Sequence, residues 1–342
     1  MPHIQTILRP ILAVAFGLAC GLVLASFAGE SPVHVLAILG RSAFGTPYDL
    51  GMSLYFATPL VLTGLAVALP YHSGLFNVGG EGQMIVGVFA AAAVGLLWPE
   101  PGALVAKLLT LVAAFTAGAL WGAIPGWMRV RRGAHEVITT IMMNFIAIGM
   151  TSWLTLGALR NTETMNPETR QVGAAYLWPR LELFGDAPLS VALLLGLVAA
   201  ACVYLLVWKT PFGGELRAVG LNERAADIAG ISVGRTRILA MALGGGLAGL
   251  AAVGEIFGNS GKFKIGFSAE YGFTGIAVAL LARGRPLGVV LAAILFGALH
   301  KGAGDLDFET EFITRDLAVV MQSLVIIAVA VDGFWRTGKG RS

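Results

Sequence analysis

Charge is what this sequence has least of. Asp, Glu, Lys and Arg make up only 13% of its 342 residues, against about 25% in an ordinary soluble domain. The hydrophobic fraction is 56% and the mean hydropathy is +0.79, so a water-facing surface of normal polarity cannot be built. These values exclude a soluble globular enzyme and predict an all-α polytopic membrane protein.

Cysteine and catalytic motifs are also scarce. The two cysteines, Cys20 and Cys202, fall inside apolar runs, which predicts packing roles and neither a disulfide framework nor a metal site. No Gly-x-x-x-x-Gly-Lys-Ser/Thr loop occurs, so the chain cannot cradle ATP by itself. No apolar run carries the paired carboxylates, Ser–Lys pair or His-rich cluster of an intramembrane enzyme, so no catalytic residue is expected.

About 20 apolar residues cross a bilayer as a helix, and ten windows approach that pattern. We expect spans near 10–29, 50–70, 83–98, 103–125, 136–157, 188–208, 236–256, 271–282, 287–301 and 317–335. The eighth and ninth windows flank Arg283-Gly284-Arg285-Pro286, and they can form two short spans or one interrupted element. The first window is long for a signal peptide and lacks a good cleavage site, which predicts a retained first helix.

The basic residues give the expected orientation. With the N-terminus inside and ten spans, 14 of the 23 Lys and Arg residues fall on the inner side, which favours cytoplasmic N- and C-termini. The basic residues are spread over short loops, so no nucleic-acid surface is expected. The whole chain, 1–342, then forms one transmembrane domain with an outer loop at 158–187 and an inner loop at 209–235.

The inner loop is expected to hold one short helix. Pro211 and the Gly213-Gly214 pair break the preceding helix, and 215–229 can form a helix that ends at Gly230. Its small residues would let a partner approach closely, and its charged residues could fix the register. An ordinary amphipathic helix on lipid headgroups fits the same pattern.

The segment between the second and third windows is polar. Residues 72–87 read HSGLFNVGGEGQMIVG, and lipid cannot satisfy open backbone or bare polar side chains. The segment must therefore face protein, water or a cargo. Amides for edge hydrogen bonds and rings for stacking predict a substrate pathway lined by Phe76, Asn77, Glu81, Gln83, Asn144 and Phe145.

A structural interpretation stands beside that one. The amides could merely hold helices together or form a turn, a role worth about 0.6 kcal/mol per hydrogen bond on average. Glu81 is expected to sit in water at the inner mouth or to pair with Arg283 or Arg285, because a bare carboxylate in lipid is costly. The spacing of Gly245 and Gly249 predicts close helix packing and not a dinucleotide site.

Four motifs resemble one family of membrane proteins. Residues 220–231 read GLNERAADIAGI, which resembles the coupling loop of ATP-binding-cassette importer permeases. Residues 74–83, GLFNVGGEGQ, are similar to the signature of their simple-sugar and nucleoside branch. Residues 135–147, HEVITTIMMNFIA, resemble the longer of two paired permeases in bacterial nucleoside importers, and 273–281, FTGIAVALL, add a fourth match. Phe145 departs from the tyrosine of many relatives, and Gly80 stands where a larger residue is common.

The resemblance implies a heteromeric, multi-pass uptake system of the bacterial cytoplasmic membrane. Its expected partners are a second, shorter permease, an ATPase with two nucleotide sites that binds ATP and Mg²⁺, and a periplasmic or lipid-anchored substrate-binding protein. No cofactor is expected on this chain, and a nucleoside is the expected cargo. The residues expected to meet the ATPase are Glu215, Arg217, Gly220, Asn222, Glu223, Ala225 and Ala226.

Two alternatives remain open from the sequence. The first is an importer of the same class for sugars or branched-chain amino acids. The second is a secondary transporter driven by an ion gradient, which would work as this chain alone.

Overall fold

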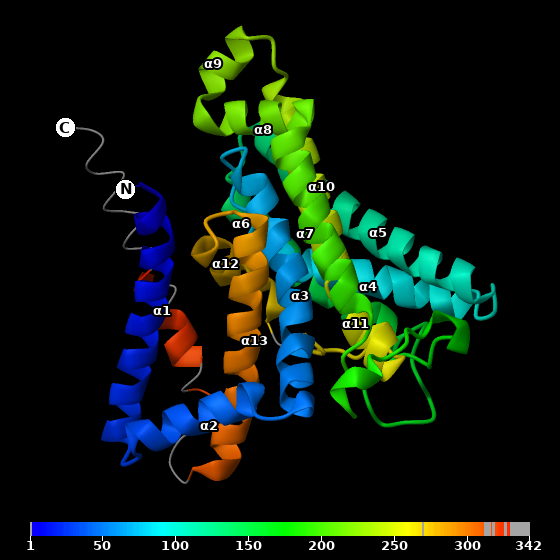
Figure 1. The fold of residues 1–342 in the computed structure, drawn as a ribbon. Coiled ribbons are helices and arrows are strands. Elements are labelled where there is room, and N and C mark those ends of the chain that lie inside the picture. The colour runs from blue at the N-terminus through cyan, green and yellow to red at the C-terminus, as the bar shows by residue number, and fades with distance from the viewer. Residues whose placement is uncertain (1, 269, 311–315, 317–318, 325–326, 329–342) are drawn as a thin grey trace.

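The computed structural model describes residues 2–268, 270–310, 316, 319–324 and 327–328, with side chains from residue 12 onward. Figure 1 shows an assembly of helices. In chain order they are α1 (Pro2–Phe27), α2 (Pro32–Phe44), α3 (Pro47–Tyr71), α4 (Gly80–Leu97), α5 (Ala103–Arg132), α6 (Glu136–Leu156), η1 (Ala174–Tyr176), η2 (Glu182–Phe184), α7 (Ala192–Lys209), α8 (Pro211–Leu221), α9 (Glu223–Ile228), α10 (Val233–Leu250), α11 (Val253–Glu255), η3 (Ile256–Ser260), α12 (Tyr271–Leu281) and α13 (Pro286–Glu309). The described part of the chain contains isolated β-bridges but no strand. The predicted all-α class is confirmed.

Seven of the described helical segments are long and apolar enough to cross a membrane. They are α3, α4, α5, α6, α7, α10 continued through η3, and α13, and they coincide with seven of the predicted windows. The apolar part of α1, Leu12–Phe27, is shorter. The tenth predicted span, 317–335, lies largely outside the described residues, so a count of ten stays a prediction.

The ambiguous region around Arg283 forms a hairpin of unequal helices. α12 has 11 residues, about 16 Å at 1.5 Å per residue, which is half of the roughly 30 Å hydrocarbon core. A turn with Arg283 and Gly284 at φ 53° and 69° leads into the 24 residues of α13. Because α12 is so short, the non-helical segment before it, 261–270, must return into the bundle.

Sequence reasoning missed α2. Ser31 and Pro32 take the N-cap and N1 positions of this 13-residue helix, an order typical of helix starts. The Ser31-Pro32 pair indicates the start of a helix, but the 13-residue stretch that follows is too short to span a membrane and was not predicted. In Figure 1, α2 lies across the lower ends of α1, α3 and α13.

α3 lies at the centre of the described helices. It contacts α7, α10, α12 and α13, and most of its residues are buried. Beside it, α5 and α10 pack through glycines. A Cβ on Gly245 would approach the backbone of Gly118 and Gly122, and one on Gly249 would approach Ala114. The predicted packing role of Gly245 and Gly249 is confirmed, since only small residues let helix backbones come this close.

The predicted inner loops gather at one end of the bundle, which we call the α8–α9 end. Val130 and Arg131 of α5 line a depression with Ser232 and Arg235 of the segment that follows α9. The turn at Gly284 lies against Tyr71 and His72, where α3 ends. The first residues of α3 and the last residues of α13 therefore lie at the opposite end, the far end (Figure 1).

Candidate functional site

A pair of side-chain amides holds the linker 72–79 between α3 and α4. Asn77 is fully buried, and its amide nitrogen donates to Gln83 Oε1 at 2.9 Å and to the Ala66 carbonyl at 3.1 Å. Gln83 Nε2 donates back to Asn77 Oδ1 at 3.0 Å, and the Gly79 N–H donates to the same oxygen at 3.0 Å. The two amides satisfy each other and fix a tight turn before α4.

Asn144 of α6 closes this turn from the other side. Its Nδ2 donates to the Val78 carbonyl at 3.0 Å, and its Oδ1 accepts from the Gly82 N–H at 2.9 Å. A Cβ on Gly82 would lie 2.8 Å from Asn144, so glycine permits the close approach. One side chain thus docks α6 onto the first turn of α4.

The structure brings some of the predicted pathway residues together and separates others. Asn77, Gln83 and Asn144 form one buried cluster whose hydrogen bonds are made within the protein. Phe76 is partly buried against the core, whereas Phe145 exposes 65% of its surface on α6. A cargo contact by these side chains stays a prediction.

Glu81 has partners that the sequence did not suggest. Its side chain accepts hydrogen bonds from the Ser268 hydroxyl and, at 2.8 Å, from the Gly272 N–H. With 5% of its surface exposed, it does not sit in water, and its bonds go to neither Arg283 nor Arg285. The expectation failed because the segment 261–270 folds back into the bundle and brings Ser268 and Gly272 against it.

Two helix N-termini meet at this carboxylate. Glu81 lies in the first turn of α4 and Gly272 in the first turn of α12, and a Cβ on Gly272 would collide with the Glu81 backbone. Each helix N-terminus carries about half a positive charge and unsatisfied N–H groups. One carboxylate between the two ends therefore stabilises both, and it couples the α3–α4 linker to the segment before α12.

A second acid, Glu255, is partly buried at the end of α11. The Tyr55 hydroxyl donates to its carboxylate, and Asn259 Nδ2 donates to the Tyr55 hydroxyl at 3.1 Å. Both bonds tie α3 to the end of the α10–η3 segment. An acid at the end of an apolar run is by default a functional candidate, so the signal was present in the sequence.

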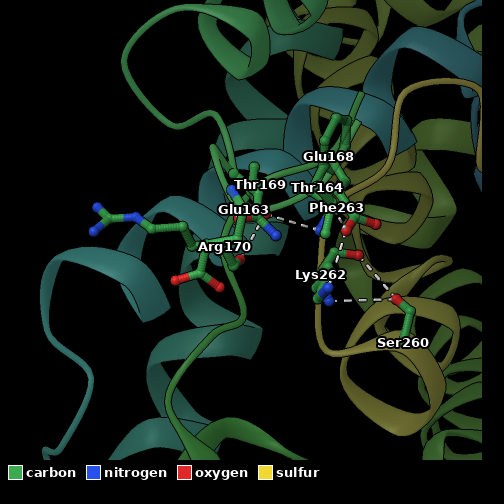
Figure 2. A network of polar contacts seen from close by, with 9 residues as sticks. Glu163, Thr164, Glu168, Thr169, Arg170, Ser260, Lys262 and Phe263 are labelled. Carbon is green, nitrogen blue, oxygen red and sulfur yellow. Dashed lines mark hydrogen bonds and ion pairs between the residues drawn. The ribbon is translucent and has the colours of Figure 1, made fainter. Parts of the chain in front are cut away.

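The predicted outer loop, 158–187, is latched onto the segment before α12 (Figure 2). Lys262 Nζ donates to Glu168 Oε1 at 2.9 Å, and Thr164 donates to the same oxygen at 3.2 Å. Thr169 exchanges bonds with the backbone of Phe263 at 2.9 and 3.1 Å. The Lys262 ammonium lowers the pKa of the buried Glu168 carboxyl below its ordinary value, against the opposing effect of burial.

The inner loop contains two helices where one was expected over 215–229. Asn222 is extended at φ −158° and caps α9 by accepting from the Ala225 N–H at 3.1 Å, so α8 and α9 meet at an angle. Glu223 forms a two-bond ion pair with Arg237 of α10, both bonds being 2.9 Å. The break follows from Asn222, whose side chain is a better N-cap than helix-interior residue.

Several predicted coupling residues face outward on this segment. Glu215, Asn222, Glu223 and Ala225 are exposed, Ala226 is buried, and Arg217 donates to the Val207 carbonyl. At the tip, Leu221 and Ile228 expose 87% and 89% of their surface. Both apolar side chains are therefore open to contact with another surface.

α8 rests on the end of α3. A Cβ on Gly220 would strike the His72 carbonyl. The His72 ring lies 3.1 Å from the Gly284 carbonyl and packs edge-on against Trp208. Burial lowers the pKa of His72, and the nearby Arg217 lowers it further. α8 is therefore in direct contact with the linker 72–79.

Comparison with known proteins identifies relatives over nearly the whole chain. A protein-family model described as "Branched-chain amino acid transport system / permease component" matches residues 50–330. The guanosine ABC transporter permease protein NupP of Bacillus subtilis is 37% identical, over 96% of this chain and 94% of its own. The glucose ABC transporter permease protein TsgB13 of Haloferax volcanii is 32% identical, over 96% and 88%. The nucleoside ABC transporter permease protein NupB of Lactococcus lactis is also 32% identical, over 96% and 91%.

More distant similarities also exist. Each of the three organisms has a second permease that is 27–28% identical over 71–73% of this chain. Among solved structures, an ABC transporter in an inward-facing conformation superposes with a TM-score of 0.49 and 15% identity, over 92% of this chain and 98% of that one.

Proposed function

The chain belongs to the family of branched-chain amino acid transport system permease components, and from this premise we propose that it is the permease subunit of an ATP-driven importer of nucleosides. The observation that carries the proposal is the similarity to NupP and NupB. In each comparison it covers about nine-tenths or more of this chain and of the relative. The first of these relatives is named for guanosine and the second for nucleosides.

We assign the α8–α9 end to the cytoplasm and its tip to a partner ATPase that binds ATP and Mg²⁺. The exposed Leu221 and Ile228 and the outward-facing Glu215, Asn222 and Ala225 support this assignment. The Glu223–Arg237 ion pair braces α9 against α10, so force on the tip would move a stiff unit. The termini would then be cytoplasmic, and the full chain 1–342 would be one multi-pass domain of a bacterial cytoplasmic membrane.

The remaining partners are a second permease and a substrate-binding protein or lipoprotein. The presence of two matching permeases in each relative's organism supports a heterodimer. The far end, which carries the latched loop 158–187, would receive cargo from the binding protein.

The contacts suggest how motion would pass through the subunit. ATP-driven closure of the partner would push α8, and α8 bears on His72 through Gly220. The linker 72–79 would carry this movement to the first turn of α4, and Glu81 would carry it on to α12. Opening and closing of the pathway would thus follow the junction of α4 and α12.

Copurification and cargo competition test the proposal. A tagged chain extracted from native membranes in mild detergent is expected to bring a second permease and an ATPase with it. The cognate binding protein is expected to release bound radiolabelled guanosine when excess adenosine is added, but not when excess glucose or leucine is added. Capture of the tagged chain without an ATPase would contradict the proposal.

Glucose is the second candidate cargo, because TsgB13 is as similar as NupB. Competition by glucose and not by adenosine would select it. Branched-chain amino acids, which appear in the family description, would be selected by competition with leucine.

A further inference from the structure

A cavity with a partly polar lining lies away from the amide cluster. This cavity, of about 320 Å³, opens between the far ends of α3 and α13. Tyr48, Met52 and Phe56 line it from α3, His300 and Phe308 line it from α13, and Gln322 closes one side. Its volume lies at the lower end of the range for small-molecule sites, about 300–1,000 Å³.

The space continues toward the middle of the bundle. A small adjoining cavity shares Phe56, His300 and Gln322 with the first and reaches Tyr271 and Thr274 of α12. α12 begins here, at the junction that Glu81 holds. The larger cavity is therefore separated from the start of α12 only by the small one, whose volume is about 10 Å³.

The wall of the larger cavity contains compensated charges. Lys301 Nζ lies 2.5 Å from Asp305 Oδ2 and 3.5 Å from Asp49 Oδ1. The Lys301 and Asp49 side chains expose only 11% and 17% of their surface. Charged groups at this depth face a water-filled cavity or the bundle interior and not lipid. In the described part of this wall, two carboxylates face one ammonium, so Lys301 is already compensated and offers little attraction to an anion.

Rings supply the apolar part of the lining. Phe56 packs against the His300 ring at a centroid distance of 4.4 Å, while Tyr48 and Phe308 expose 44% and 81% of their surface. A flat heterocycle gains from aromatic faces, and hydroxyl groups gain from an amide such as that of Gln322. A neutral molecule that has both a flat heterocycle and hydroxyl groups matches this lining.

We propose that this cavity is a transient binding site for neutral nucleosides inside the permease and that it rejects their phosphorylated forms. The inference rests on the proposed function, since it names where the same cargo first rests after it leaves the binding protein. The first residues to contact the cargo would then lie at the far ends of α3 and α13, and not at the amide cluster of Asn77, Gln83 and Asn144.

Ligand protection of a single cysteine tests the site without requiring transport. Met52→Cys is made in the complete complex after Cys20 and Cys202 are changed to Ala, and a membrane-impermeant maleimide is added from the far side. Saturating guanosine is expected to slow labelling several-fold, and GMP at the same concentration is expected to leave it unchanged. Glu100→Cys, in the exposed loop after α4, is expected to label equally with and without ligand.

The outcomes separate this inference from the proposed function. Unchanged labelling of Met52→Cys in guanosine, from a complex that still imports guanosine, would overturn the site and leave the function standing. Equal protection by GMP would overturn the selection of neutral ligands. Protection by glucose and not by guanosine would overturn the nucleoside site.

Uptake kinetics give a second, independent readout. Phe56→Ala is expected to lower the maximal rate of guanosine uptake by about fivefold or more, because loss of a ring that stacks on a base weakens binding at least that much. Phe16→Ala, a similarly sized change on the exposed face of α1, is expected to keep the wild-type rate. Equal rates for the two variants, at equal amounts of assembled complex, would contradict the inference.

Discussion

At the scale of single residues, Glu81 holds together two helices that are far apart in sequence. Its carboxylate accepts the Gly272 N–H at the start of α12 while it lies in the first turn of α4. α12 is about half as long as the bilayer is thick, so its N-terminus lies inside the bundle. The N–H groups there, and those of the segment before it, need hydrogen-bond partners because lipid offers none. A single acid therefore makes a broken helix tolerable in the membrane.

Replacement of Glu81 tests this role. Glu81→Ala leaves the Gly272 N–H unpaired and is expected to destabilise the purified complex by about 1–3 kcal/mol, whereas Glu81→Gln keeps an acceptor and is expected to lose less. Thermal unfolding in detergent measures the difference. Glu100→Ala, which removes an exposed acid, is expected to unfold at the wild-type temperature. The same result for Glu81→Ala would contradict a structural role for the Glu81 carboxylate.

The Glu168–Lys262 pair predicts a dependence on acid pH. Because the folded-state pKa of Glu168 is lowered, the stabilisation is fully present above the ordinary carboxyl pKa of about 4.3 and is lost as the pH falls through the lowered value. Limited proteolysis of the loop 158–187 is expected to accelerate below that pH. Glu168→Gln is expected to be cleaved quickly at all pH values, and Glu163→Gln, an exposed neighbour, is expected to follow the wild type.

Sequence reasoning located important residues but not their partners. Asn77, Gln83 and Asn144 stood out because amides are rare in apolar surroundings, yet their mutual hydrogen bonds depend on how the linker folds. The partners of Glu81 are 187 and 191 residues away. No local sequence pattern predicts a contact between residues so far apart in the chain. The sequence therefore predicted only that burial of the Glu81 carboxylate is costly.

At the scale of elements, the contact between α8 and the end of α3 is the step on which the proposed coupling depends. Gly220→Ala adds a methyl group against the His72 carbonyl and is expected to cost about 1–3 kcal/mol in that contact. Gly214→Ala is the matched control on the same helix, because a Cβ there meets nothing within 4 Å.

ATP-driven uptake is expected to fall several-fold in Gly220→Ala and to stay at the wild-type rate in Gly214→Ala. ATPase activity of the assembled complex, measured in parallel, is expected to persist in both variants. Equal uptake by the two variants would show that α8 does not act through the α3–α4 linker.

The sequence predicted the helices whose formation depends on their own length and apolarity. It did not predict the elements whose formation depends on tertiary packing. The windows at 50–70, 103–125 and 136–157 correspond to long helices, since each can satisfy its own backbone. The short α12 and its return segment, 261–270, depend on Glu81 and on the loop latch for partners. α2 fell below the length of a span although Ser31-Pro32 signalled its start.

At the scale of the whole molecule, three features follow one another from the α8–α9 end to the far end. The exposed tip of α8 and α9 is at one end, the junction of α4 and α12 is inside, and the cavity of about 320 Å³ is at the far end. The chain has no ATP-binding loop of its own. Under the proposed function, a partner ATPase supplies the movement that this order of features would transmit.

Reconstituted transport tests this account most directly. Proteoliposomes that contain this chain with its second permease and ATPase are given binding protein and radiolabelled guanosine, with ATP supplied on the side of α8 and α9. We predict accumulation of guanosine that requires ATP and is insensitive to ionophores. Accumulation by vesicles that hold this polypeptide alone, driven by an ion gradient and abolished by ionophores, would contradict the account.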